Sequence, residues 1–251
     1  IIEDARISAV TFTGSTGAGR KVGAAAGGAL KKTVLELGGS DPYIVLADAD
    51  IAHAAKVCAA ARLVNTGQSC IAAKRFIVVN EVHDAFVEAF STELGRPLSG
   101  NPLQEDTGTG PLARADLAQE LHQQVSRTIA EGASLHFGGI MPEGPGSYYP
   151  VTLLMEVTAQ MTAAREELFG PVAPVIKARN TEEAIAIAND SDFGLGGAIF
   201  TADSKSAWDL ASNAIETGAI AINAQLASDP RLPFGGIRHS GFGRELGEFG
   251  L

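Results

Sequence analysis

The order of apolar segments most restricts the folds open to this chain. Short runs rich in β-branched and aromatic residues alternate with longer segments in which apolar residues recur every three or four positions. The first run, at 7–14, ends in a glycine and is followed by an Ala-rich segment at 18–32. This alternation continues along the sequence. It predicts an α/β fold with a largely parallel sheet flanked by helices.

The same patterns place the individual elements. We expect strands at 7–14, 33–39, 42–46, 74–80, 133–137, 148–154, 171–178, 196–200 and 218–222. We expect helices at 18–32, 51–63, 82–94, about 117–129, 181–189 and 203–215. The glycine-dense segment 233–250 is predicted to be a long ordered loop near a site, because glycine lets the backbone approach a ligand closely.

The charge balance and hydropathy exclude two classes of partner. Lys and Arg total 19 against 29 Asp and Glu, which gives a formal net charge of −10 without a dense basic run. A nucleic-acid partner is therefore not expected. No apolar stretch reaches the ~18 residues that a membrane span needs, so no membrane partner is expected. No signal peptide is recognisable, and we expect a cytoplasmic protein.

The cysteines and histidines do not form a metal or disulfide pattern. Two cysteines, Cys58 and Cys70, are too few for a disulfide framework. The five histidines show no HExxH spacing and the cysteines no CxxC spacing, so we expect no metal site. Cys58 falls on the apolar face of the helix predicted at 51–63, and we interpret it as an inert core thiol.

Residues 14–21, GSTGAGRK, follow a predicted strand and open a predicted helix. Backbone N–H groups at such a turn can hold phosphate oxygens. The segment lacks the Gly-Lys-Ser/Thr ending of a Walker A loop, and Gly23 comes one residue late for a GxGxxG fingerprint. By itself it fits a phosphate-binding turn or a glycine-rich turn without a ligand.

Two further residues are candidates for chemistry. Glu36 ends an apolar strand just before a Gly-Gly turn, where partial burial would raise its pKa and suit a general base; a solvated turn residue is the alternative. Cys70 lies in NTGQSCIAAKR (65–75), before small residues and a basic pair. A thiol becomes a nucleophile where a helix N-terminus, a cation or fixed dipoles lower its pKa. Alone, Cys70 fits a nucleophile or a core residue.

Five motifs together resemble those of the aldehyde dehydrogenase superfamily. FTGSTGAG resembles its nucleotide-side turn, ELGGSDP its general-base motif and NTGQSC its nucleophile motif, while EELFGPV and PFGGIRHSGFGRE resemble its nicotinamide-ribose motif and its C-terminal signature. Glu36 precedes Cys70 by 34 residues and Glu167 follows it by 97, which matches the order and spacings of that family. ASDPRLPFGG and NTGQSCIAAKRFIV are most similar to bacterial NAD(P)-dependent succinate-semialdehyde dehydrogenases.

The resemblance implies a mechanism. The Cys70 thiolate would attack the carbonyl of a small-molecule aldehyde to form a thiohemiacetal and then a thioester, with NAD or NADP as hydride acceptor. Glu36 would activate the water that releases the acid, and we expect it to face Cys70 across a cleft. A CoA-acylating enzyme is a subsidiary possibility, against which Glu36 as a water-activating base argues.

The resemblance also implies binding residues. Gly14, Ser15 and Gly19 match the turn that faces the pyrophosphate of the cofactor. Glu167 would hold a nicotinamide-ribose hydroxyl, and Phe169 would pack near the nicotinamide ring. Ser228 sits where some members place a hydroxyl for the distal substrate carboxylate. Other members use an Arg six residues before the nucleophile, a position that Val64 occupies here, and Arg62 is two residues farther back.

The resemblance divides the chain and leaves a second function class open. It implies a remnant of a Rossmann-like NAD(P)-binding domain at 1–38, a catalytic domain at 39–240 and a return segment at 241–251. Since family members are nearly twice this length, we expect a chain truncated at its N-terminus, with little aldehyde oxidation of its own and weak ester hydrolysis. The family also implies a homo-oligomer. The alternative is a non-catalytic fragment or assembly module that retains the fold.

Overall fold

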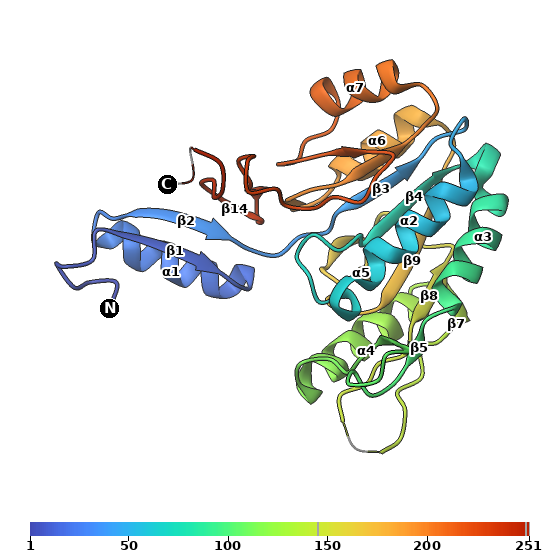
Figure 1. Ribbon diagram of the computed structural model, residues 1–251, viewed down its shortest axis with the longest axis horizontal. Helices are drawn as coiled ribbons and strands as arrows, with labels where there is room; N and C mark the ends of the chain where they lie inside the picture. The colour runs from blue at the N-terminus through green and yellow to red at the C-terminus, as the bar shows by residue number, and fades with distance from the viewer. Residues whose placement is uncertain (145, 249, 251) are drawn as a thin grey trace.

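A small β–α–β unit lies beside a larger α/β body (Figure 1). The structure, a computed structural model, describes residues 1–144, 146–248 and 250. Two positions of the predicted segment 241–251, residues 249 and 251, are therefore outside the described residues. The segment after β2 joins the two parts, and the C-terminal loop returns to the small unit (Figure 1).

The small unit consists of β1 (Ala9–Thr13), α1 (Thr16–Gly28) and β2 (Lys32–Glu36). β1 and β2 are parallel, with Ala9 opposite Lys32 and Thr13 opposite Glu36. The helix begins where the Oγ atom of Ser15 accepts the backbone N–H of Ala18 over 3.3 Å. β14 (Gly241–Phe242) pairs antiparallel with the other edge of β2, which places the C-terminal loop against this unit.

The body contains a seven-stranded sheet in the order β12–β11–β3–β4–β9–β8–β7. β7 and β8 are antiparallel and all other neighbouring pairs are parallel. This confirms the predicted α/β class with a largely parallel sheet. The strands are β3 (Pro42–Val45), β4 (Arg75–Val79), β7 (Ser134–Phe137), β8 (Thr152–Met155), β9 (Val172–Ala178), β11 (Ala198–Phe200) and β12 (Ala221–Ile222).

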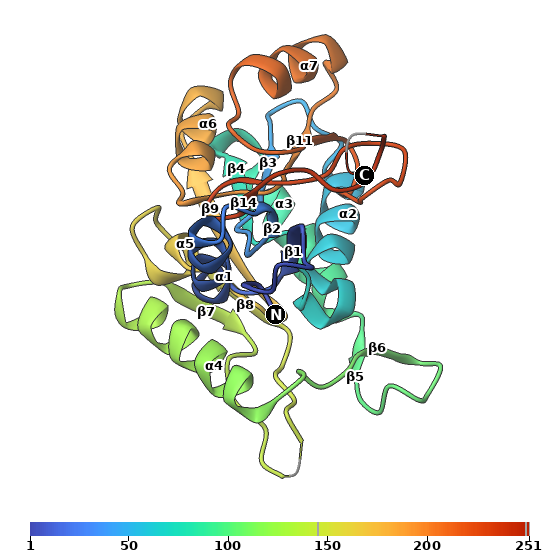
Figure 2. The same cartoon turned by 90° about the vertical axis from the view of Figure 1, so that its left-hand side faces the viewer.

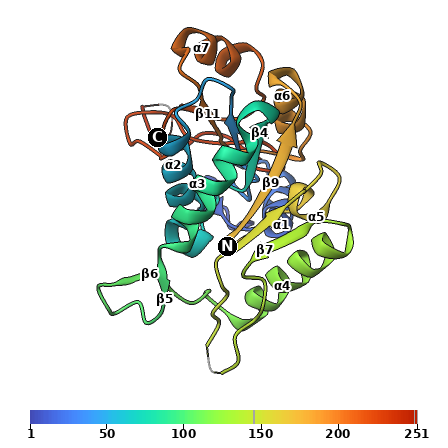
Figure 3. The same ribbon diagram turned by 90° about the vertical axis from the view of Figure 1, so that its right-hand side faces the viewer.

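Helices cover both faces of this sheet (Figure 3). α2 (Ile51–Leu63) and α3 (His83–Gly95) pack on one face, and α4 (Ala115–Ala130), α6 (Thr181–Asn189) and α7 (Ser204–Asn213) pack on the other. Since side chains alternate along a strand, Tyr43 and Val45 enter the core beneath α2 and α3, whereas Ile44 enters the opposite core.

Several short elements were not predicted. They are β5 (Leu98–Ser99) and β6 (Thr107–Thr109), which pair with each other and extend away from the body (Figure 2), α5 (Thr162–Arg165), and β10 (Phe193–Gly194) with its antiparallel partner β13 (Ile237–Arg238). Two 3₁₀ turns lie at Val64–Gly67 and Asn80–Val82. Elements this short are below the length at which hydrophobic periodicity identifies a strand or helix.

Several boundaries differ from the prediction, and three of the larger differences are these. The segment 233–250, expected to lack regular elements, contains β13 and β14, because its backbone pairs with β10 and β2. The strand expected at 148–154 begins only at Thr152. The first helix ends at Gly28 rather than at residue 32, because Lys32 already pairs with β1. Within the described residues, no helix is long and apolar enough to cross a membrane.

Candidate functional site

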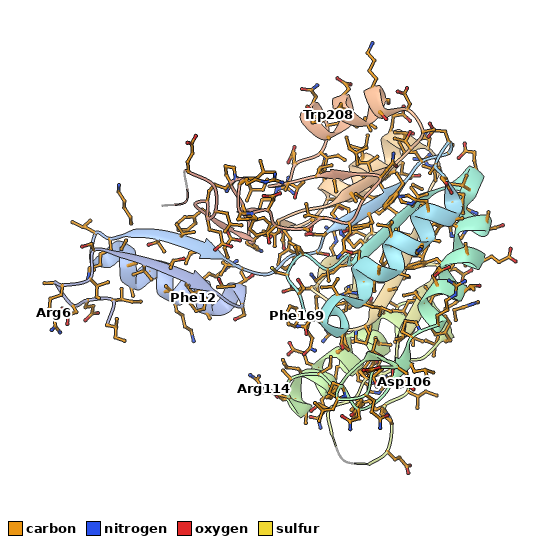
Figure 4. All side chains as sticks on the ribbon, in the orientation of Figure 1. Arg6, Phe12, Asp106, Arg114, Phe169 and Trp208 are labelled. Carbon is orange, nitrogen blue, oxygen red and sulfur yellow. The ribbon has the colours of Figure 1, made fainter. Side chains whose placement is uncertain are left out.

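A cavity of about 980 Å³ lies where the small unit, α4 and the loops before β4 and β9 meet. Figure 4 shows two of its residues, Phe169 and Arg114, on the side of the body that faces the small unit. The lining residues are Thr13, Gly14, Ser15, Thr16, Gly17, Leu37, Gly38, Gln68, Ser69, Cys70, Arg114, Leu117, Glu120, Leu121, Gln124, Arg165, Glu166, Glu167, Phe169, Asp192, Phe193 and His239.

The cavity brings together most of the predicted site residues. Cys70, Glu167, Phe169, Gly14 and Ser15 all line it, although they come from both parts of the molecule. The other three candidates, Glu36, Gly19 and Ser228, are not among the described residues that line the cavity.

The loop before Cys70 is held in an uncommon backbone conformation. Asn65, Thr66 and Gly67 have positive φ angles of 49°, 57° and 78°, a left-handed run that is unfavourable for a β-branched residue such as Thr66. Tertiary contacts stabilise it. The Oγ1 atom of Thr66 accepts the backbone N–H of Gly110 over 3.0 Å, and Arg62 Nη2 donates to the Gly67 carbonyl over 2.8 Å.

Gly67 itself is required by close packing. A Cβ atom there would lie 2.3 Å from the carbonyl oxygen of Gly170, a backbone atom that precedes β9. The next residue adds a further attachment, because the side-chain oxygen of Gln68 accepts the N–H of Ala113 over 2.8 Å. The loop is thus positioned from two sides, by the approach to β9 and by the segment before α4.

The Cys70 thiol lies in a partly exposed position of the cavity wall, whereas Cys58 is fully buried in the core beneath α2. The interpretation of Cys58 as a core residue is confirmed. Burial raises the pKa of the Cys70 thiol, and the carboxylates of Asp41 and Glu167 raise it further. The Lys74 cation and the backbone N–H of Ile71 act in the opposite direction, because both stabilise the thiolate. The surroundings of Cys70 in this structure therefore do not lower the pKa of its thiol, as a nucleophile would require.

The backbone around Cys70 offers a free donor. Among the hydrogen bonds of the described residues, none uses the Cys70 N–H as donor. An N–H beside a thiol and open to a cavity is suited to an oxyanion that develops on a carbonyl attacked by that thiol.

Glu167 has one carboxylate oxygen, Oε1, with partners and one, Oε2, without a hydrogen bond among the described residues. Its Oε1 atom accepts the N–H of Gly39 over 3.0 Å and lies 3.4 Å from the Nζ atom of Lys74. Its Oε2 atom faces Gly38, where a Cβ would be 2.3 Å away. The side chain is 20% exposed. An acceptor fixed on one side and open on the other fits a ligand hydroxyl.

Glu36 is buried immediately before the cavity-lining residues Leu37 and Gly38. Both carboxylate oxygens lack a partner among the described residues. The glycine-rich C-terminal segment lies against it: a Cβ on Gly235 would be 2.9 Å from Oε1 of Glu36. Burial raises the pKa of this carboxyl to about 7, with Glu245 raising it further and Arg244 lowering it. The group is therefore ionised and neutral in comparable amounts near neutral pH.

The turn into α1 fits an anionic ligand. Ser15, Thr16 and Gly17 line the cavity at the helix N-terminus, where backbone N–H groups have no intrahelical acceptor. A Cβ at Gly17 would meet no atom within 4 Å, so the wall is open there. Gly19 is different: a Cβ would lie 2.3 Å from the Leu37 side chain. Its glycine allows close helix packing.

Neither residue considered for a substrate carboxylate reaches the cavity. Ser228 is exposed in the loop after β12. Arg62 is fully buried; one of its nitrogen atoms donates to Gly67, and two others, Nε and Nη1, have no partner in the described structure. The cavity-lining arginines are Arg114 and Arg165, each in an ion pair with an aspartate.

Sequence reasoning missed Lys74, whose buried ammonium donates to carbonyl groups of the nucleophile loop. The basic pair after the cysteine motif, Lys74 and Arg75, indicated a cation near the loop. The sequence does not show which of the two side chains faces the loop. Other unpredicted cavity residues, such as His239, come from distant segments whose meeting the sequence does not reveal. Among the described residues no group of three or more His, Cys, Asp or Glu is arranged to hold a metal ion.

Comparison with known proteins places this geometry in a family. The profile of the aldehyde dehydrogenase family matches residues 1–251. A succinate semialdehyde dehydrogenase [NAD(P)+] of Escherichia coli (strain K12) is 53% identical over the whole chain, which covers 54% of that protein. A probable succinate-semialdehyde dehydrogenase [NADP(+)] of Synechocystis is 49% identical, with 55% of its length covered.

A solved structure is similar throughout the chain. The succinic semialdehyde dehydrogenase of Streptococcus pyogenes in complex with NADP+ superposes with a TM-score of 0.96 at 41% identity, over 99% of this chain and 55% of that one. The chain therefore spans about half the length of the relatives it matches.

Proposed function

We propose that this chain, which belongs to the aldehyde dehydrogenase family, carries the thiol chemistry of an NAD(P)-dependent aldehyde oxidation. The observation that carries the proposal is the convergence of Cys70, Glu167 and the Ser15 turn on one cavity. The names of the similar proteins support succinate semialdehyde as the aldehyde.

Cys70 is the proposed nucleophile. Its thiolate attacks the aldehyde carbon and forms a thiohemiacetal, and the free N–H of Cys70 donates to the developing oxyanion. A thiol is suited to this step because the thioester formed on oxidation can still be cleaved by water. The thiolate regenerates when the acid leaves.

Glu36 is the proposed general base for that cleavage. It accepts a proton from water as the water oxygen attacks the thioester carbon. A pKa of about 7 and two unpartnered oxygens support the assignment. Since the cavity lining includes Leu37 and Gly38 but not the Glu36 side chain, the role requires the carboxylate to turn toward the cavity.

A nicotinamide nucleotide, NAD or NADP, fits the remaining polar groups. The Gly14 and Ser15 turn would hold phosphate oxygens, the free Oε2 of Glu167 would accept a ribose hydroxyl, and the exposed ring of Phe169 would pack beside the nicotinamide. When bound, the nucleotide supplies the hydride acceptor. Gly19 would act indirectly, through the packing of α1 on Leu37.

The domain assignment follows from the same arrangement. We propose a nucleotide-binding part at 1–38, a catalytic part at 39–240 and a return segment at 241–251. The pairing of β14 with β2 supports the return, and the cavity between the parts supports the boundary after Gly38.

The test compares variants of the purified chain in two reactions. Hydrolysis of p-nitrophenyl acetate requires the thiol and the oxyanion donor, so Cys70→Ala should abolish it and the matched variant Cys58→Ala should retain it. Formation of NADH or NADPH with succinate semialdehyde should show the same dependence on Cys70. Equal activity of the wild-type chain and Cys70→Ala in both reactions would contradict the proposal.

A further inference from the structure

Lys74 is a cation enclosed by the nucleophile loop. Its side chain is fully buried. The Nζ atom donates to the carbonyl of Ser69 over 2.9 Å, of Cys70 over 2.7 Å and of Ala72 over 3.3 Å. Three carbonyls directed at one ammonium define the path of the backbone on both sides of the Cys70 side chain.

The same ammonium also contacts Glu167, a second residue of the cavity wall. Oε1 of Glu167 lies 3.4 Å from it, and that oxygen also accepts the N–H of Gly39. Because a buried charge is costly unless it is paired and hydrogen-bonded, Lys74 holds Glu167 and the loop together. Removal of the ammonium would leave the carbonyls of Cys70 and Ala72 without a donor among the described residues. The Ser69 carbonyl would keep the N–H of Ala72, and Oε1 of Glu167 would lose its counter-charge.

The neighbouring arginines cannot replace it. Arg75 donates to the carbonyls of Ser40, Ile187 and Ala188, away from the loop. Among the hydrogen bonds of the described residues, Arg62 donates to the loop at Gly67, before the cysteine. Among the described residues, the cation that contacts the carbonyls of Ser69, Cys70 and Ala72 is therefore Lys74.

We propose that Lys74 is a positioning residue that sets the geometry of the nucleophile loop and of Glu167 as one unit and supplies the positive charge that favours the Cys70 thiolate. The proposal rests on the roles given above to Cys70 and Glu167. No feature of the NTGQSC motif itself assigns a role to this lysine.

The charges around the thiol determine the sign of the effect. Lys74 favours the thiolate, while Asp41 and Glu167 disfavour it, and the Ile71 N–H favours it. The other charged or titratable groups of the cavity wall are Arg114, Glu120, Arg165, Glu166, Asp192 and His239. Loss of Lys74 should raise the pKa of Cys70, and loss of the Glu167 charge should lower it.

The experiment measures the rate at which iodoacetamide alkylates Cys70 as a function of pH, with mass spectrometry to resolve Cys70 from Cys58. In Lys74→Met the midpoint should move up by about one pH unit, which lowers the rate at pH 7 about tenfold. Lys74→Arg keeps the charge and should return the midpoint most of the way to the wild-type value. In Glu167→Gln the midpoint should move down.

A loss of packing alone would lower the unfolding temperature or change the rate equally at every pH, without opposite midpoint shifts. If Lys74→Met does not fold, the double variant Lys74→Met/Glu167→Gln removes both charges. Its midpoint should lie above the wild-type value, but by less than the rise of about one pH unit expected for Lys74→Met. An unchanged or lower midpoint in a folded variant that lacks Lys74 would overturn the proposal.

Alkylation needs neither aldehyde nor ester, so the two proposals can fail separately. If ester hydrolysis depends on Cys70 but the midpoints do not shift, only the positioning role is overturned. If hydrolysis does not depend on Cys70, the proposed function is overturned even where the midpoints shift.

Discussion

Gly39 donates its backbone N–H to Oε1 of Glu167 over 3.0 Å and at the same time packs against the carbonyl of Cys70. The segment between β2 and β3 therefore contacts both the loop of the candidate nucleophile and the carboxylate that faces it. Gly39 precedes Cys70 by 31 positions and Glu167 by 128, and the three residues meet only in the folded chain.

The close approach at Gly39 predicts an intolerant position. A Cβ there would lie 2.6 Å from the Cys70 carbonyl oxygen, so Gly39→Ala requires a backbone shift. We expect a loss of about 1–3 kcal/mol in the free energy of unfolding, measured by urea denaturation. Gly27→Ala is the control, because a Cβ there meets nothing within 4 Å and alanine favours the helix. Equal destabilisation by both variants would contradict the packing argument.

The buried carboxyl of Glu36 predicts a pH-dependent stability. Its folded-state pKa, about 7, is above the ordinary 4.5, so the folded chain binds more protons between these values. The contribution of Glu36 to stability is complete below about pH 4.5 and is lost as the pH rises through about 7. Glu36→Gln should therefore raise the free energy of unfolding at pH 8, by at most about 3 kcal/mol.

The same variant should have much less effect near pH 4.5, where Glu36 is neutral in the folded state and about half protonated in the unfolded state. Urea denaturation at the two pH values measures the difference. Glu105→Gln, at an exposed loop position, is the control and should change little at either pH. A Glu36→Gln effect of equal size at both pH values would show that the raised pKa is not its source.

The two cysteines should differ in reactivity. Cys58 is fully buried and Cys70 partly exposed in the cavity wall. Brief treatment of the native chain with iodoacetamide should label Cys70 at least about tenfold faster, as read by mass spectrometry of peptides. In urea the two should react at similar rates. Faster labelling of Cys58 in the native chain would argue against the site.

The end of α1 predicts a stabilising change. Leu30 has a φ angle of 55° and is 95% exposed. Its N–H donates to the carbonyl of Gly27, and the N–H of Lys31 donates to the carbonyl of Ala26. This is the hydrogen-bond pattern of a helix end that favours glycine at the position of Leu30. Leu30→Gly should raise the free energy of unfolding by about 1 kcal/mol. Leu30→Val, which is β-branched, should lower it. Denaturant titration of both variants distinguishes this from a loss of hydrophobic contact.

Elements with strong local signals were predictable. The helix expected at 51–63 has those bounds, because Asp50 caps its start with its side chain and its apolar face is continuous. The apolar runs of β4 and β9 were found to within a residue. The strand pairs of the C-terminal loop were missed, because β14 forms only where β2 supplies a partner edge.

Part of the site was predictable for a similar reason. Cys70, Glu167 and the turn at Ser15 lie in motifs whose residue types suit their proposed chemistry, and the cavity brings them together. Ser228 was assigned by its position in a motif, yet the loop that carries it is exposed and away from the cavity. A motif specifies residue types and spacing, but the direction of a loop depends on contacts with other segments.

The sequence by itself determined the alternation of strands and helices, the family and the residues capable of chemistry, because these depend on local periodicity and on short motifs. Only the tertiary structure decided that Lys74 rather than Arg75 faces the nucleophile loop, and that the Glu36 carboxyl lies buried against the C-terminal glycines. Burial and the positions of neighbouring charges control both properties. They arise from segments that are distant in sequence and become fixed when the chain packs.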